Sequence, residues 1–175
     1  MANKKVTVPA DANLTNVNLQ NANLEDADLQ NANLKHAKIY EANLQNVNLI
    51  EADLQDAHLR EACLNDVGLE RADLSSAHLT GANLRNADLW DAVLESASLQ
   101  DTNLRNAKLN NAKLNYANLE EANLVEAKLF RANLENTNLQ YTDISNLDFS
   151  HIPREAIKQF IDDWRASTEE EITSL

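Results

Sequence analysis

Glycine, proline and cysteine are nearly absent from this 175-residue chain, which contains two Gly, two Pro and one Cys. Stretches rich in Gly and Pro mark turns and linkers, so their absence leaves no point at which to divide the chain into two globular domains. The single cysteine, Cys63, excludes an intramolecular disulfide and removes the usual reason to expect an oxidising compartment.

Long apolar runs are absent as well. No stretch has the length and hydrophobicity of a signal peptide or a membrane span, so we expect a cytoplasmic protein without a membrane partner. The formal net charge of −13 disfavours direct binding to nucleic acid and to anionic membranes. Both of those partners require Lys and Arg in contact with phosphate.

A large apolar residue does occur at every fifth position from Leu14 to Phe149, through twenty-eight consecutive units. The residue two before it is Ala in twenty-one of these units. Five residues advance an α-helix by about 500°, so the apolar column would drift around a helix and form no stripe. In a flat strand an odd period would send successive Leu to opposite faces. The backbone must therefore turn as it advances, with Leu and Ala inside and the other three residues outside.

Asn or Asp precedes the apolar residue in eighteen units, as in Ala-Asn-Leu at 22–24 and 82–84. These side chains bond to nearby backbone and tolerate corner geometry. The pattern A(D/N)Lxx resembles the pentapeptide repeat proteins over about residues 10 to 150, and its style is most similar to the cyanobacterial members. The resemblance implies an all-β solenoid, the right-handed quadrilateral β-helix with four pentapeptides per coil.

Twenty-eight units at four units per coil give seven coils. Residues twenty apart should then stack in columns along a rod about 34 Å long. We divide the chain into an N-terminal arm or cap at 1–10, the β-helix at 11–151 and a C-terminal helical cap at 152–175. The cap rests on a change of period that predicts a helix over 153–166. Its apolar face includes Ile157, Phe160, Ile161 and Trp164. The N-terminus has no comparable cap, so homodimerisation through an end of the rod, which is common in the family, is a hypothesis here.

Catalytic and cofactor motifs are missing, and we predict neither an enzyme nor a cofactor. Stacking at twenty residues places Lys38, His58 and His78 in one column, where two imidazoles about 5 Å apart could hold a metal. The preferred interpretation is that both histidines are tolerated variants at a corner position usually held by Asn. Cys63 is interpreted in the same way, as a small neutral substitute, with a reactive thiol as the alternative.

The outward carboxylates suggest a second function, because some pentapeptide repeat proteins mimic duplex DNA and inhibit or protect DNA gyrase. The densest acidic column consists of Glu41, Glu61, Asp101 and Glu121, and Gly81 interrupts it. The charge is otherwise spread evenly over the four faces and is sparser than a phosphate ladder. A solvated surface that maintains solubility is therefore the favoured interpretation.

The outward apolar residues suggest a docking site. Ile50, Trp90 and Phe130 fall forty residues apart, on one face and on alternate coils. A spaced row of large apolar groups is typical of a protein interaction surface. The alternative is that surface apolar residues are simply scattered, since others lie on different faces: Tyr40, Tyr116, Val125 and Tyr141. The sequence thus predicts a rigid, non-enzymatic scaffold for an unidentified protein partner, with the DNA-mimicking modulator of gyrase as the alternative.

Overall fold

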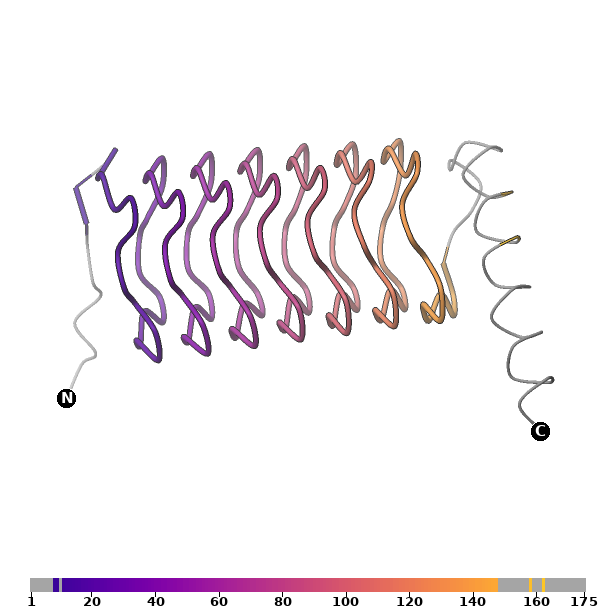
Figure 1. The fold of residues 1–175 in the computed structure, drawn as a ribbon, viewed down its shortest axis with the longest axis horizontal. Helices are drawn as coiled ribbons and strands as arrows, with labels where there is room; N and C mark the ends of the chain where they lie inside the picture. Colours follow the sequence, from indigo (N-terminus) through magenta and orange to yellow (C-terminus); the bar gives the residue numbers. More distant parts are fainter. Residues whose placement is uncertain (1–7, 10, 148–157, 159–161, 163–175) are drawn as a thin grey trace.

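The computed structural model describes residues 8, 9, 11–147, 158 and 162. Over residues 11–147 the backbone winds into a stack of similar coils, each lying beside the next along one axis (Figure 1). We call this stack the rod. Its stepwise advance from the indigo to the orange end in Figure 1 means that a residue's number fixes its position along the axis.

Parallel bridges connect each coil to the next with a register of twenty residues. Asn13 pairs with Asn33, Asn33 with Asp53, and Asp53 with Asp73. Four such columns begin at Asn13, Asn18, Asn23 and Asp28, so each coil has four sides. Within the described residues every side contributes one isolated bridge residue and no longer strand. The predicted coil of four pentapeptides is therefore present.

The corners between the sides are tight turns. The N–H of Val17 donates to the carbonyl of Leu14 at 3.1 Å, and the same contact recurs along the rod. The second residue after each inward Leu has a positive φ, as at the third position of a type II turn. Glycine occupies this position only at Gly81, where φ is 70°. Asn and Asp are frequent here because they tolerate left-handed backbone better than other residues do.

This geometry corrects the sequence-based assignment of corners. The Asn or Asp that precedes the inward Leu lies at a bridge on a flat side, and the corner lies two residues after the Leu. The preceding side chain still bonds to the backbone, since Asn43 Oδ1 accepts the N–H of Gln45 at 3.1 Å. His58 and His78 therefore lie at bridges on a side of the rod and not at corners.

The interior consists of stacked Leu and Ala side chains, as the period predicted. The inward leucines in the middle of the rod are fully buried, among them Leu34, Leu54, Leu84 and Leu114. The alanines two residues before them are at most 1% exposed. Close packing across such a narrow interior requires a small residue opposite each Leu. Where Thr102 replaces Ala, its buried hydroxyl donates to the carbonyl of Leu99 at 2.6 Å, which satisfies the polar group.

Val8 packs against the core at the N-terminal end, although Leu14 and Leu19 of the first coil remain only partly buried. At the other end Lys158 and Asp162 are helical and exposed. The remaining predicted cap residues lie outside the described residues, so the cap and the domain boundaries stay predictions; they include Ile157, Phe160, Ile161 and Trp164. Within the part of the chain that is described, no helix is long and apolar enough to cross a membrane.

Candidate interaction surface

Ile50, Trp90 and Phe130 occupy equivalent positions at one corner of the rod, and we call them the apolar row. Each is the residue directly after an inward Leu. Their carbonyls accept hydrogen bonds from the preceding coils: Asn111 N–H donates to Phe130 at 2.8 Å, and Arg71 N–H donates to Trp90 at 2.9 Å. Trp90 and Phe130 are 48% and 43% exposed, whereas Ile50 is half-buried. Large side chains thus stand on a backbone that is hydrogen-bonded from coil to coil.

Side-chain acceptors fix the backbone of the row further. Asn48 Oδ1 accepts the N–H of Ile50 at 3.1 Å, and Asp88 Oδ1 accepts the N–H of Trp90 at 3.3 Å. At Phe130 the residue two before is Lys128, which has no acceptor. The Phe130 N–H donates instead to Asn110 Oδ1, one coil earlier, at 3.1 Å. A different residue therefore supplies the same support.

The exposed ring of Phe130 lies beside a cation. The guanidinium carbon of Arg131 is 5.1 Å from the ring centroid, within the range of a cation–π interaction. A hollow of about 380 Å³ lies beside Phe130, and its lining includes Asn110, Glu126 and Lys128. The C-terminal part of the row therefore has charges of both signs beside it, Arg131 and Lys128 against Glu126.

A hollow of about 310 Å³ separates Ile50 from Trp90. Its remaining lining is charged and consists of Glu70, Arg71, Asp88 and Asp91. Two of these side chains are already paired with neighbouring coils. Arg71 Nη1 lies 3.0 Å from Glu51 Oε1, and Lys108 Nζ lies 2.6 Å from Asp88 Oδ2.

The Lys108 to Asp88 contact has an electrostatic consequence. The hydrogen bond to Asp88, and then the charge of Asp88, raise the pKa of the Lys108 ammonium. Glu70 and Asp91 have no such ion pair among the described residues. The hollow between Ile50 and Trp90 thus carries two carboxylates outside any ion pair, next to an indole, although the charge of Glu70 also contributes to raising the pKa of Lys108.

Gly68 gives the Glu70 carboxylate its position. A Cβ on Gly68 would lie 3.2 Å from Glu70 Oε2 and 3.7 Å from Ile50 Cγ1. The Oε2 atom is buried and has no hydrogen-bond partner among the described residues. The sequence analysis missed this arrangement. Its one signal was Gly68 in a column where the adjacent coils have Asn48 and Asp88.

The acidic column lies at a different corner, at the positions with positive φ. Glu41, Glu61, Asp101 and Glu121 have φ between 55° and 58°. Gly81 occupies the coil between Glu61 and Asp101, and Arg60 Nη2 lies 3.2 Å from Glu61 Oε1. The structure places the four carboxylates in one column, but a glycine and an ion pair interrupt their charge.

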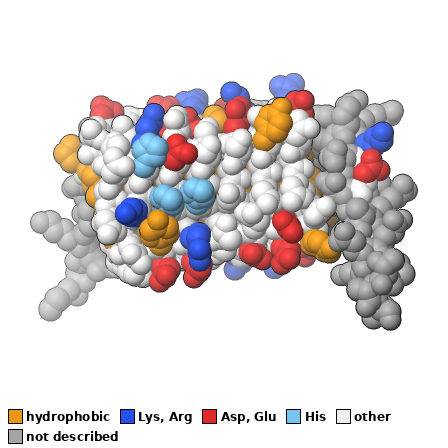
Figure 2. Space-filling model, viewed as in Figure 1, with side chains coloured by type: hydrophobic (Ala, Val, Ile, Leu, Met, Phe, Trp, Pro, Cys, Tyr) orange, Lys and Arg blue, Asp and Glu red, His pale blue; other side chains and the backbone are white. Residues whose placement is uncertain are grey.

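The histidine column is continuous. Bridges join Lys38 to His58 and His58 to His78, and the two imidazole rings stack with centroids 4.8 Å apart. The ring of Tyr40 lies 5.4 Å from that of His58. Figure 2 shows the histidine side chains close together on one face. Burial, and then the charges of His78 and Lys38, lower the pKa of His58. The described residues contain no group of three or more ligating side chains that could hold a metal ion.

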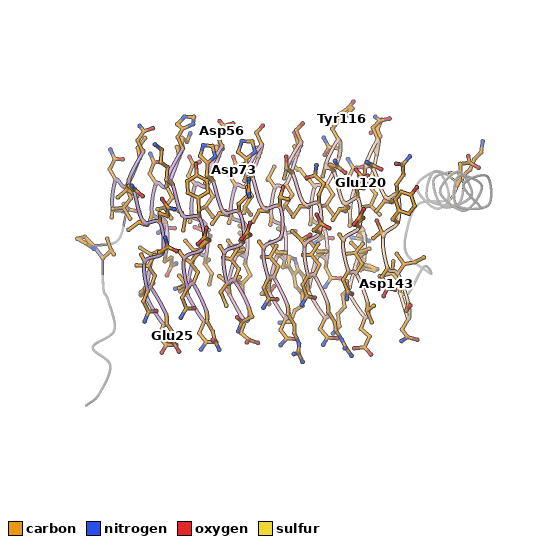
Figure 3. The ribbon with its side chains drawn as sticks, turned by 60° about the horizontal axis from the view of Figure 1, so that its bottom comes forward. Glu25, Asp56, Asp73, Tyr116, Glu120 and Asp143 are labelled. Atoms are coloured by element: carbon orange, nitrogen blue, oxygen red, sulfur yellow. The ribbon has the colours of Figure 1, made fainter. Side chains whose placement is uncertain are left out.

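Two tyrosines are exposed away from the row. Tyr116 is 60% exposed and projects from an edge of the rod opposite to Glu25 (Figure 3). Tyr141 is 41% exposed. Exposure alone therefore does not distinguish the row, whose special feature is the alignment of three apolar residues with a hollow between two of them.

The chain matches the sequence profile of pentapeptide repeats in eight copies that extend from residue 10 to residue 152. No curated protein sequence matches it. A pentapeptide repeat protein from the thylakoid lumen of Arabidopsis thaliana has a similar crystal structure, with 27% identity and a TM-score of 0.51 over 58% of this chain and 67% of that one. HetL of the cyanobacterium Nostoc, described as involved in regulating heterocyst differentiation, has 27% identity and a TM-score of 0.44 over 79% and 72%.

QnrB1, a plasmid-mediated fluoroquinolone resistance protein, has 14% identity and a TM-score of 0.50 over 84% of this chain and 83% of its own. At that identity the likeness concerns the fold alone. The profile match covers nearly the whole rod and agrees with its twenty-residue coils. The chain therefore belongs to the pentapeptide repeat family.

Proposed function

We propose that this protein is a non-enzymatic, rigid scaffold that binds a protein partner through the apolar row. The observation that supports the proposal most directly is the exposure of Trp90 and Phe130 in one column of the rod. Water contact with two such rings has a free-energy cost that a binding partner removes. Trp is also among the residues that most often dominate the affinity of protein interfaces.

The rod suits this role because its backbone is hydrogen-bonded along its length. Asp91 N–H donates to Asn110 at 3.0 Å, and Asn111 N–H donates to Phe130 at 2.8 Å, so the corner that holds the row is supported coil by coil. A rigid surface loses little conformational entropy on binding. Three side chains at fixed spacing can thus select a partner by shape.

The test compares capture of partners from an extract of the native organism. The immobilised wild-type protein is compared with Trp90→Ala plus Phe130→Ala and with Tyr116→Ala, which removes an even more exposed ring at another corner. We expect the double variant to fold normally and to lose a protein that both the wild type and Tyr116→Ala retain. Equal recovery by all three proteins would contradict the row as the docking site.

A DNA-mimicking modulator of gyrase is the alternative function, and the acidic column is the feature that favours it. The column supplies four carboxylates at one corner, with the gap at Gly81. Basic side chains lie among acidic ones along the edges of the rod (Figure 2). Gyrase supercoiling in the presence of excess protein tests this alternative, which requires a change in activity that is lost in Glu61→Gln plus Asp101→Asn.

Homodimerisation through an end of the rod and a cytoplasmic location also remain predictions. The partial burial of Leu14 and Leu19 in the first coil supports an end that a second copy could cover. Light scattering at high protein concentration tests this association. A monomeric mass throughout would contradict it.

A further inference from the structure

Building on the proposed function, we infer that the apolar row binds a basic, proline-rich segment of its partner in the polyproline II conformation. Three observations support this class of ligand. They are the spacing of the row, the hollow between Ile50 and Trp90, and the two lining carboxylates, Glu70 and Asp91, that form no ion pair among the described residues.

The spacing of the row matches one turn of polyproline II. Adjacent coils are about 4.8 Å apart, so side chains on alternate coils are separated by about 9.6 Å. Polyproline II has three residues per turn and rises about 3.1 Å per residue, which gives about 9.3 Å per turn. Over the two intervals from Ile50 to Phe130 the accumulated mismatch is only about 0.6 Å.

Other extended or helical ligands match less well. An α-helix presents equivalent side chains every seven residues, or about 10.5 Å, and is out of register by roughly 1.8 Å over the same two intervals. A β-strand presents side chains on one side about every 6.6 Å, whereas Trp90 lies about 9.6 Å from Ile50 along the rod. A strand aligned with Ile50 would therefore have no side chain opposite Trp90. The row therefore favours polyproline II over both.

The hollow between Ile50 and Trp90 has the chemistry that a proline-rich ligand requires. Aromatic-lined grooves bind such segments in other proteins, because the ligand is already extended before it binds. Here an indole forms one wall and an aliphatic side chain the other, with a volume of about 310 Å³. One turn of a proline-rich segment would fill the space between the two side chains.

Glu70 and Asp91 determine that a positively charged ligand is favoured. Arg71 and Asp88, the other charged residues of the lining, are paired with Glu51 and Lys108. The two remaining carboxylates favour Lys or Arg in the ligand, and an Arg could also stack on Trp90. Glu70 lines the hollow, and its Oε2 has no hydrogen-bond partner among the described residues.

The experiment titrates the full-length protein with short synthetic peptides at about 0.15 M salt, where general attraction to an acidic protein is screened. One peptide repeats Pro-Pro-Arg, one repeats Gly-Ser-Arg at the same length and charge, and one is an Arg-bearing α-helical peptide. Trp90 fluorescence reports binding in a Trp164→Phe background, where it is the only indole.

We expect the Pro-Pro-Arg peptide to bind at least tenfold more tightly than the other two. Trp90→Ala, measured by calorimetry, and Glu70→Gln should each reduce its affinity, the first by about tenfold or more. Glu135→Gln, an exposed carboxylate at another corner, should leave it unchanged. Equal affinity for all three peptides, or no effect of Glu70→Gln, would overturn the inference.

The two proposals fail differently. If Trp90→Ala plus Phe130→Ala still abolishes capture of a cellular partner while the Pro-Pro-Arg peptide does not bind, the scaffold function stands and the ligand class is wrong. If peptide binding and capture are both unaffected by that double variant, the apolar row is not a docking site.

Discussion

Gly68 provides the space that the Glu70 carboxylate occupies, since a Cβ on Gly68 would lie 3.2 Å from Glu70 Oε2. Most residues at equivalent positions carry a side chain that caps the next turn, as Asn48 does for Ile50. Gly68 has no side chain that could form this cap, and the space is occupied by Glu70 Oε2, a buried oxygen without a hydrogen-bond partner among the described residues. Both features reduce stability. Because Glu70 lines the hollow beside Trp90, the proposed binding gives a reason for this loss of stability.

Gly68→Asn should therefore stabilise the protein and weaken the proposed binding. Asn restricts the unfolded chain and can accept the N–H of Glu70, which together contribute about 1 kcal/mol. The same side chain displaces the Glu70 carboxylate from its position. Urea unfolding should show the gain, and the Pro-Pro-Arg peptide should bind less tightly. A destabilised Gly68→Asn protein would show instead that the Glu70 carboxylate cannot move aside for the new side chain.

The core should tolerate no charge. Leu84 is fully buried in a middle coil, so Leu84→Asp would bury a carboxylate without a partner and should prevent folding. Leu84→Ala leaves only a cavity and should cost about 2 to 5 kcal/mol. Asn83→Asp, the neighbouring outward position, serves as the control and should melt near the wild type. Circular dichroism during heating distinguishes these outcomes, and a native melting curve for Leu84→Asp would refute the inward assignment.

The period of five was enough to predict the register and the core. Once Leu and Ala had to point inward, counting by twenty correctly placed Lys38, His58 and His78 in one column. The same counting aligned Ile50 with Trp90 and Phe130. These predictions required only the path of the backbone. The inward side chains are nearly the same in every unit, so their packing needed no separate prediction.

The corner assignment could not be made from composition. Asn and Asp occur before the inward Leu, where they cap the turn, and also two residues after it, where they adopt positive φ. Both roles favour the same residue types, so frequency does not tell them apart. The hollow beside Trp90 was missed for another reason. It depends on where the flexible side chain of Glu70 lies, and a repeat pattern carries no information on that.

Gly81 tests the corner geometry directly. With φ at 70°, Gly81→Ala forces a Cβ into left-handed backbone and should cost about 1 kcal/mol. Gly81→Asn should cost less, because Asn tolerates this conformation and Asn21 holds it in the same column. Thermal melting of the two variants gives the comparison. A Cβ at this position would also lie 3.3 Å from Glu61 Cγ, so an equal loss in both variants would mean that this contact, and not the backbone, determines the cost.

The stacked pair His58 and His78 should make stability depend on pH. Burial, His78 and Lys38 lower the pKa of His58 in the folded state below its ordinary value of about 6.5. As pH falls through about 6.5, the unfolded chain takes up a proton that the folded protein resists, so stability falls toward acid and is highest above this range. We expect the melting temperature of the wild type to fall between about pH 7.5 and 5.5, and that of His58→Asn to fall less. Tyr116→Ala, which leaves both stacked imidazoles in place, is the control and should keep the wild-type slope. If His58→Asn keeps that slope as well, the stacked imidazoles do not couple protonation to folding.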